Sequence, residues 1–226
     1  MGSRLIKIHN EEINKNIFLR YGVKSDMVCY KDVFEGRYHV IDLDPEPKTV
    51  LDLGSNIGLT ALHYRRIWPK AQIVGLEMDS DNFNVAVENL QDEDVLLINY
   101  AVSDSLGRIY YDKKRGSQQC YRISKVQTKK SIQGYSMSLD MALDYLNIGG
   151  VVDFVKMDIE GTELDIIGGS GAWESRIRNL LVEVHGETDE ETPKNVKKIK
   201  KMLEDKEFNV KRHKIHWSAL HAWKTI

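Results

Sequence analysis

Two short runs of ionisable residues in this 226-residue chain have the residue types and spacing to perform chemistry together. The first is Lys156-Met157-Asp158-Ile159-Glu160-Gly161-Thr162-Glu163, and the second is Glu183-Val184-His185. Side chains alternate between the two faces of a strand, so Lys156 and Asp158 share a face, and the acid and imidazole of the second run also share one. Because charges are expensive to bury without a purpose, we interpret the runs as neighbouring strand ends facing one reacting group.

This pairing of acid and imidazole is suited to removing a proton from an alcohol. A general base such as His185 would accelerate that step by roughly 10²- to 10⁴-fold. Alternatively, Asp158 with Glu183 or His185 could bind a hard cation that lowers the pKa of the hydroxyl group. Oxygen-rich ligation would suit Mg²⁺, but one histidine and few certain carboxylates make the metal the less favoured alternative. No metal ligand is therefore assigned from the sequence.

The stretch Thr49–Thr60 has the features of a nucleotide-binding turn. An apolar run leads into Gly54, which tolerates backbone angles that a side chain forbids, and Gly58 allows backbone or ligand to approach closely. Asn56 stands where the dinucleotide fingerprint requires its second glycine, so a pyrophosphate fits poorly. A nucleoside without phosphate, such as S-adenosylmethionine, fits better than an NAD-type cofactor.

Two acids near this turn are candidate cofactor ligands. Glu77 follows Gly54 by roughly 20 residues, the distance at which an acid binds both ribose hydroxyls. Asp52 lies beside the turn, where it can accept from loop N–H groups or meet the ammonium group of the cofactor.

Hydrophobic patterns predict the elements that position these residues. We expect strands over 50–53, 71–77, 95–98, 151–158 and 179–185, and helices from Gly58 to about Trp68, from Ser80 or Asp81 as N-cap, over 139–146 with Ser138 as N-cap, over 161–167 and over 192–206. Alternating strands and helices favour an α/β fold with a parallel sheet and helices on both faces. Ligands then bind at the carboxyl ends of the strands, which gathers Gly54, Glu77, Asn99, Asp158 and His185 around one crevice.

The remaining segments are assigned by position. Residues 1–48 are expected to cover the substrate side of a domain over 49–226. Residues 105–137 interrupt the alternation of strands and helices and are interpreted as an insertion in that domain. Residues 208–212 and about 216–223 are interpreted as closing strands. Three histidines near the end, at positions 213, 216 and 221, are interpreted as structural, and Trp217 and Trp223 as core or a homodimer contact.

Composition and charge limit the classes of molecule that the chain is expected to bind. The net charge is −2, so no strong positive field exists to hold a nucleic-acid backbone. The two cysteines lie far apart and form no metal pattern, which favours a cytoplasmic protein. No apolar run approaches the roughly 20 residues of a membrane span, and no signal peptide is recognised.

With these residues assembled, the chain resembles the FkbM family of S-adenosylmethionine-dependent methyltransferases. The resemblance rests on five stretches, from about Tyr30 to Gly186: 50–58, 99–104 with Gly107, Ser138-Leu139-Asp140, 155–163 and 183–185. The K-x-D-x-E-G-x-E run is the most specific of them, whereas the glycine turn alone would indicate only a class I methyltransferase.

The resemblance implies a Rossmann-like, seven-stranded sheet whose last strand pairs antiparallel, and O-methylation of sugars or small metabolites. It implies that 52–58 hold the methionine part, Glu77 the ribose and 101–103 the adenine. The cofactor set expected is Asp52, Gly54, Ser55, Asn56, Gly58, Glu77, Met78, Ala101, Val102 and Ser103. The catalytic set expected on the acceptor side is Lys156, Asp158, Glu160 and His185. A cofactor-binding scaffold without chemistry and an NAD-linked oxidoreductase are the alternatives.

Overall fold

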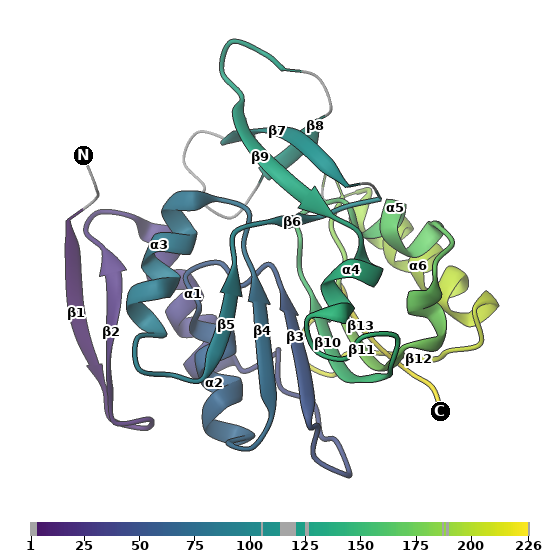
Figure 1. Cartoon of the computed structure of the whole chain (residues 1–226), viewed down its shortest axis with the longest axis horizontal. Helices are drawn as coiled ribbons and strands as arrows, with labels where there is room; N and C mark the ends of the chain where they lie inside the picture. The colour runs from purple at the N-terminus through teal and green to yellow at the C-terminus, as the bar shows by residue number, and fades with distance from the viewer. Residues whose placement is uncertain are drawn as a thin grey trace.

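A seven-stranded sheet forms the centre of the molecule, and a four-stranded sheet and a two-stranded hairpin flank it (Figure 1). The computed structural model describes residues 4–104, 106–113, 121–124, 127–186, 188 and 190–225. The central strands are β3 Thr49–Leu53, β4 Gln72–Leu76, β5 Val95–Ile98, β10 Val152–Met157, β11 Ile177–Glu183, β12 Asn209–Arg212 and β13 Ala219–Trp223. Their order in the sheet is β12-β13-β11-β10-β3-β4-β5.

This strand order creates a switch point beside β3. The chain adds β4 and β5 on one side of β3 and then crosses to place β10 and β11 on the other, all in parallel pairs. Only β13 pairs antiparallel among these strands, with β11 on one side and β12 on the other. The predicted mostly parallel sheet is thus confirmed, and its switch point is the place where such sheets bind ligands.

Helices cover both faces of the sheet because alternate strand residues point to opposite sides. The helices are α1 Lys24–Lys31, the π-helical η1 Asp32–Gly36, α2 Leu59–Ile67, α3 Ser80–Asn89, α4 Leu139–Asp144, α5 Glu163–Gly168, the 3₁₀ turn η2 Ala172–Ser175 and α6 Thr192–Asp205. Leu51 and Leu53 belong to a core with α4, α5 and α6, whereas Val50 belongs to a second core with α1, α2 and α3. No helix in the described ranges has the length and apolar character needed to cross a bilayer.

The N-cap of α3 differs from the prediction. Asp79, not Ser80 or Asp81, caps this helix, because its extended backbone lets the carboxylate accept from the N–H groups of Asp81 and Asn82. Ser138 caps α4 as predicted, accepting from the N–H of Met141.

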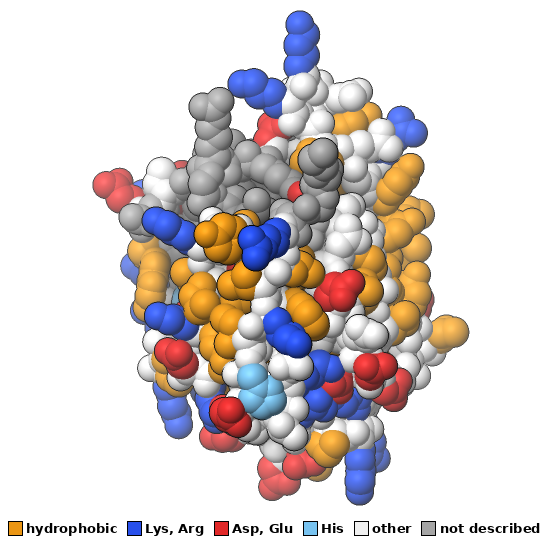
Figure 2. Space-filling view, turned by 90° about the vertical axis from the view of Figure 1, so that its left-hand side faces the viewer, with side chains coloured by type: hydrophobic (Ala, Val, Ile, Leu, Met, Phe, Trp, Pro, Cys, Tyr) orange, Lys and Arg blue, Asp and Glu red, His pale blue; other side chains and the backbone are white. Residues whose placement is uncertain are grey.

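The first 48 residues divide into two parts. Strands β1 Leu5–Asn10 and β2 Lys15–Arg20 form a hairpin that lies against α3, at the left of Figure 1. Asn89 fixes it there: its amide oxygen accepts from the N–H of Phe18 at 2.7 Å, and its amide nitrogen donates to the carbonyl groups of Phe18 and Ile57. Figure 2 views this side, where Lys and Arg are interspersed with Asp and Glu. The second part, α1 with η1, packs beside α2.

The segment interpreted as an insertion, together with Ala101 and Val102 just before it, builds the four-stranded sheet. Its strands are β6 Ala101–Val102, β7 Gly107–Lys113, β8 Tyr121–Ser124 and β9 Ile132–Met137, in the order β6-β9-β7-β8. In Figure 1 this sheet stands above the carboxyl ends of β3, β4 and β5. The runs Ile109-Tyr110-Tyr111 and Tyr121-Arg122-Ile123 predict short strands, which β7 and β8 confirm. The sequence IQGYSM of β9 lacks a clear apolar alternation and predicts no strand.

Gly54 ends β3 at the point of closest approach to β10. Its φ is +80°, and a Cβ at this position would lie 1.8 Å from the carbonyl oxygen of Asp158. The N–H groups of Gly54 and Ser55 both donate to the carbonyl of Leu76 at 2.9 Å. The turn is therefore clamped between the ends of β10 and β4, in a space that only glycine fits.

Gly54→Ala should lower the free energy of unfolding by about 3 kcal/mol or more, since the left-handed backbone and the backbone clash add. Urea denaturation measures this loss. Gly36→Ala is the control, because its Cβ would meet only the Lys31 carbonyl at 3.9 Å, and it should stay within about 1 kcal/mol of the parent chain. Equal losses of unfolding free energy in the two variants would contradict the close packing of the Gly54 turn between the ends of β10 and β4.

Candidate active site

The turn after β3 and the end of β4 are joined through a buried carboxylate. Glu77 accepts from the N–H of Asn56 and from the N–H of Asp79, both at 2.8 Å. Burial raises the pKa of Glu77 to about 7, although these two N–H groups oppose the shift. Asn99 supports the same corner by donating to the carbonyls of Glu77 and Met78. The predicted ribose ligand is therefore held rigidly at a strand end.

Two residues of the predicted cofactor set have their surroundings filled by protein. A Cβ on Gly58 would lie 3.0 Å from the Cβ of Ala86, so this glycine permits the approach of α3 to α2. The Ser55 hydroxyl points back to the carbonyl of Asp52 at 3.0 Å. Packing and hydrogen bonding within the protein are thus sufficient to explain why Gly58 and Ser55 occur here. Their contact with a cofactor stays a prediction.

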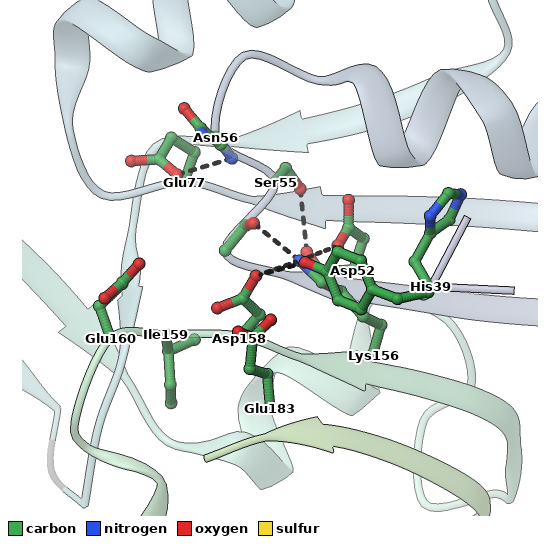
Figure 3. Close-up of polar contacts among 12 residues, drawn as sticks. His39, Asp52, Ser55, Asn56, Glu77, Lys156, Asp158, Ile159, Glu160 and Glu183 are labelled. Carbon is green, nitrogen blue, oxygen red and sulfur yellow. Dashed lines mark hydrogen bonds and ion pairs between the residues drawn. The ribbon is translucent and has the colours of Figure 1, made fainter. Parts of the chain in front are cut away.

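Lys156 is the charged centre beneath the turn. Its side chain is 3 % exposed. Its ammonium group donates to the Gly54 carbonyl at 3.1 Å and lies 3.3 Å from Asp52 Oδ1 and 3.4 Å from Asp158 Oδ2 (Figure 3). Burial opposes its charge, but the two carboxylates outweigh burial and raise the pKa of Lys156. The lysine is therefore a cation that ties β3 to the end of β10.

Asp158 connects this lysine to the acceptor side. Its Oδ2 accepts a hydrogen bond from the Tyr38 hydroxyl at 3.1 Å, and its Oδ1 lies 3.7 Å from His185 Nε2. Burial alone would raise the pKa of Asp158, but the charge of Lys156, and then that of His185, lower it. Asp158 is therefore an ionised carboxylate with one oxygen turned to each side.

His185 lies among four carboxylates, as the paired strand ends predicted. Its Nδ1 is 2.9 Å from Glu163 Oε1, and its Nε2 lies 3.6 Å from Glu183 Oε1 and 3.8 Å from Glu160 Oε2. Burial lowers the pKa of His185, but hydrogen bonds to Glu163 and Glu183 outweigh it and raise the pKa to about 12. An imidazole in this state already holds both protons, so the arrangement does not favour its predicted role as a base.

Glu160 reaches the same space on a left-handed backbone, with φ of 60°. Burial, followed by the charge of Asp158, raises the pKa of Glu160 to about 8. This carboxylate is therefore close to the charge transition at neutral pH.

A cavity of about 210 Å³ joins the two halves of the site. Nine residues predicted for the cofactor or the chemistry line it: Gly54, Asn56, Glu77, Met78, Ala101, Val102, Lys156, Asp158 and Glu160. Asp52, Ser55, Gly58, Ser103 and His185 do not line it. Asp52 and His185 stand directly behind lining residues, and Ser103 donates its N–H to the carbonyl of Met137 at the end of β9.

Several lining residues were missed in the sequence. Tyr38 and His216 lie in irregular segments, where no periodicity marks a side chain as inward-facing. His216 was interpreted as structural, yet it borders the cavity with its Nε2 3.5 Å from Glu183 Oε1. The others are Cys29, Asp32, Val33, Thr60, Leu76, Asn82, Tyr100 and Ile159. Glu183, a candidate cation ligand in the sequence analysis, also lines the cavity. Tyr38 in particular had no sequence signal other than its aromatic character.

The strand order and the glycine turn at the switch point match the Rossmann-like fold of class I methyltransferases. Residues 30–210 match the family model described as the methyltransferase FkbM domain. The chain therefore belongs to the FkbM methyltransferase family, as the sequence resemblance predicted, and it is an enzyme.

Relatives with assigned names agree with this membership. The chain is 26% identical over 225 residues to Methyltransferase sdnD of Sordaria araneosa, covering 84% of each chain. It is 26% identical to 2-O-methyltransferase NoeI of Sinorhizobium fredii, covering 62% of this chain and 63% of that one. It is 28% identical to Hexuronic acid methyltransferase AglP of Haloferax volcanii, covering 68% and 62%.

A solved structure supports the fold. An O-methyltransferase family protein from Burkholderia thailandensis is similar with a TM-score of 0.54 and 12% sequence identity. The similarity covers 89% of this chain and 58% of that chain. The fold is thus shared at a sequence distance where residue roles do not transfer.

Lys156→Met should lower the free energy of unfolding by about 3–5 kcal/mol, because it leaves Asp52 buried without a counter-ion. The double variant Asp52→Asn with Lys156→Met should recover a large part of that loss. Urea denaturation of the parent chain, the two single variants and the double variant measures the coupling energy between the two residues.

Lys201→Met is the matched control. Lys201 pairs with Asp205 on the exposed side of α6, with 75% of its side chain accessible, so its removal should change stability by less than about 0.5 kcal/mol. A Lys156 variant as stable as this control would show that the buried pair does not hold the strand ends together.

Proposed function

We propose that this enzyme transfers the methyl group of S-adenosylmethionine to a hydroxyl oxygen of a sugar, a glycan or a small hydroxylated molecule. The observation that carries the proposal is the continuous cavity between the Glu77 corner and the Asp158 cluster. One end offers a carboxylate for a ribose, and the other offers ionisable groups for an acceptor.

The cofactor end favours an adenosyl group without phosphate. Asn56 occupies the turn with a left-handed φ of 49°, and its N–H is already bonded to Glu77, so the turn offers no open glycine cradle for a pyrophosphate. Glu77 still has lone pairs for ribose hydroxyls, and Met78, Ala101 and Val102 provide an apolar wall beside it. This wall suits the adenine ring.

The reaction at the other end is an in-line displacement. The oxygen of the acceptor attacks the methyl carbon, the carbon–sulfur bond breaks with its electron pair moving to sulfur, and the hydroxyl proton leaves to the carboxylates that line the cavity. Alignment of the two reactants is the largest requirement and is worth roughly 7–11 kcal/mol of the barrier. The rigid ends of β3, β4 and β10 supply that alignment here.

The acceptor class is supported by the relatives. NoeI is named as a 2-O-methyltransferase, which refers to transfer to an oxygen, and AglP as a methyltransferase of hexuronic acid, which is a polyhydroxylated acceptor. Carboxylates and Tyr38 at the acceptor end can accept from and donate to such hydroxyl groups. We therefore assign a polyhydroxylated acceptor rather than an apolar one.

The affinity for S-adenosylmethionine should fall as the pH drops below about 7. The reason is that Glu77 then binds a proton, with a pKa of about 7, and loses acceptor strength toward the ribose. Above that pH the carboxylate is ionised and the affinity should level off. Calorimetric titrations at a series of pH values measure the effect.

Glu77→Gln should bind S-adenosylmethionine about tenfold or more weakly and without this pH dependence, since each charged hydrogen bond is worth roughly 1.5–3 kcal/mol. Glu46→Gln, at an exposed position, should retain the parental affinity and its pH dependence. Unaltered binding by Glu77→Gln, or tighter binding of NAD than of S-adenosylmethionine, would refute the cofactor assignment.

A screen of sugars, glycans and hydroxylated metabolites with S-adenosylmethionine, followed by mass spectrometry, tests the reaction. A product with one added methyl group on oxygen is expected. Asp158→Asn should reduce its formation by roughly 10²-fold or more while S-adenosylmethionine still binds. Cofactor binding without product from any acceptor would instead support a binding scaffold.

A further inference from the structure

We infer that Asp158, Glu183 and His185 form a site for one hard divalent cation, Mg²⁺ or Mn²⁺, at the acceptor end of the cavity. This inference rests on the proposed function, because the cation would bind the hydroxyl group that receives the methyl group. It reverses the preference drawn from the sequence, where the ligand set was judged too small.

The three side chains converge as ligands of one ion. One ligand atom from each lies within 4.8 Å of the other two, and His185 Nε2 is 3.7 Å from Asp158 Oδ1 and 3.6 Å from Glu183 Oε1. Ligands at about 2.1 Å from an octahedral ion lie about 3.0–4.2 Å apart. The two distances from His185 Nε2 fall within this range, and the limit of 4.8 Å for the remaining pair exceeds it by about 0.6 Å at most, so the ligand atoms need to move by less than about 1 Å.

The imidazole is aimed by groups outside the ligand set. Glu163, which is 1% exposed, accepts from His185 Nδ1 and from the N–H groups of Ile159 and Gly161. The carbonyl of His185 accepts from Asn195 on α6 at 2.9 Å. A carboxylate on the remote nitrogen of a histidine is the usual support of a metal ligand, because it orients the other nitrogen toward the ion.

The two carboxylate oxygens of Asp158 have different neighbours. Tyr38 donates to Oδ2, and Lys156 also lies beside Oδ2, which leaves Oδ1 facing His185. Lys156 shares its charge with the fully buried Asp52, so it does not neutralise the acids on the other side. A divalent cation between Asp158 and Glu183 would replace the Nε2 proton of His185 as the positive charge among these acids, and that proton would be released on binding.

The position fits a role toward the acceptor. Asp158 and Glu183 both line the cavity, so a cation held by them has open coordination positions on the cavity side. An acceptor hydroxyl bound there would have a lower pKa, and its proton would pass to a carboxylate or to water as the oxygen–methyl bond forms. A neighbouring hydroxyl could occupy a second position, which favours vicinal diols as acceptors.

The test uses full-length protein stripped with a chelator and titrated with Mn²⁺, followed by electron paramagnetic resonance and calorimetry. One Mn²⁺ per chain is expected, with Mg²⁺ competing for it. Glu183→Gln and His185→Ala should each weaken Mn²⁺ binding at least tenfold, whereas His9→Ala, at an exposed histidine outside the site, should not. All variants are also checked for S-adenosylmethionine affinity and for thermal unfolding.

The outcomes separate this inference from the proposed function. No saturable binding at millimolar Mn²⁺, or equal binding by all variants, would overturn the cation site. Methyl transfer that continues unchanged in excess chelator would also overturn it while leaving the methyltransferase proposal intact. Loss of S-adenosylmethionine binding in the parent chain would instead refute the proposed function, whatever Mn²⁺ does.

Discussion

The buried ammonium group of Lys156 is the interaction on which the site depends. It joins three parts of the chain: the turn carbonyl after β3, the acid inside β3 and the acid after β10. Because about a hundred residues of sequence separate β3 from β10, no local preference can align their ends. A single cation shared by Asp52 and Asp158 does so, and it is the counter-ion of the fully buried Asp52.

The two halves of the cavity are built by different means. At the cofactor end, backbone N–H groups and one carboxylate fix a turn whose shape Gly54 and Asn56 determine. At the proposed acceptor end, ionisable side chains from the turn after β10, from β11 and from α5 meet around His185. A backbone-built end suits a cofactor that never changes, whereas a side-chain-built end can vary with the acceptor without altering the sheet.

The central sheet could be predicted from the sequence because its strands are apolar runs followed by a turn residue, as in Val50–Leu53 and Gly54. The sequence was also sufficient for the acid cluster because strand periodicity and parallel pairing place Asp158 and His185 together. It was insufficient for Tyr38 and His216, which reach the cavity from segments without regular structure, and for the charge state of His185, which depends on Glu163 and Glu183 across space. The positions of Tyr38 and His216 and the charge state of His185 depend on tertiary contacts, which the spacing of residues in the sequence does not predict.

The pairing of β9 with β6 has a consequence for how ligands enter. Ser136 and Met137 are in register with Ala101 and Val102, so the four-stranded sheet is hydrogen-bonded to the wall beside the proposed adenine position. That sheet therefore cannot swing away without breaking this wall. Asp32 and Val33 of η1 and His216 near the C-terminus also line the cavity, so the N-terminal and C-terminal parts of the chain both border the space that an acceptor would occupy.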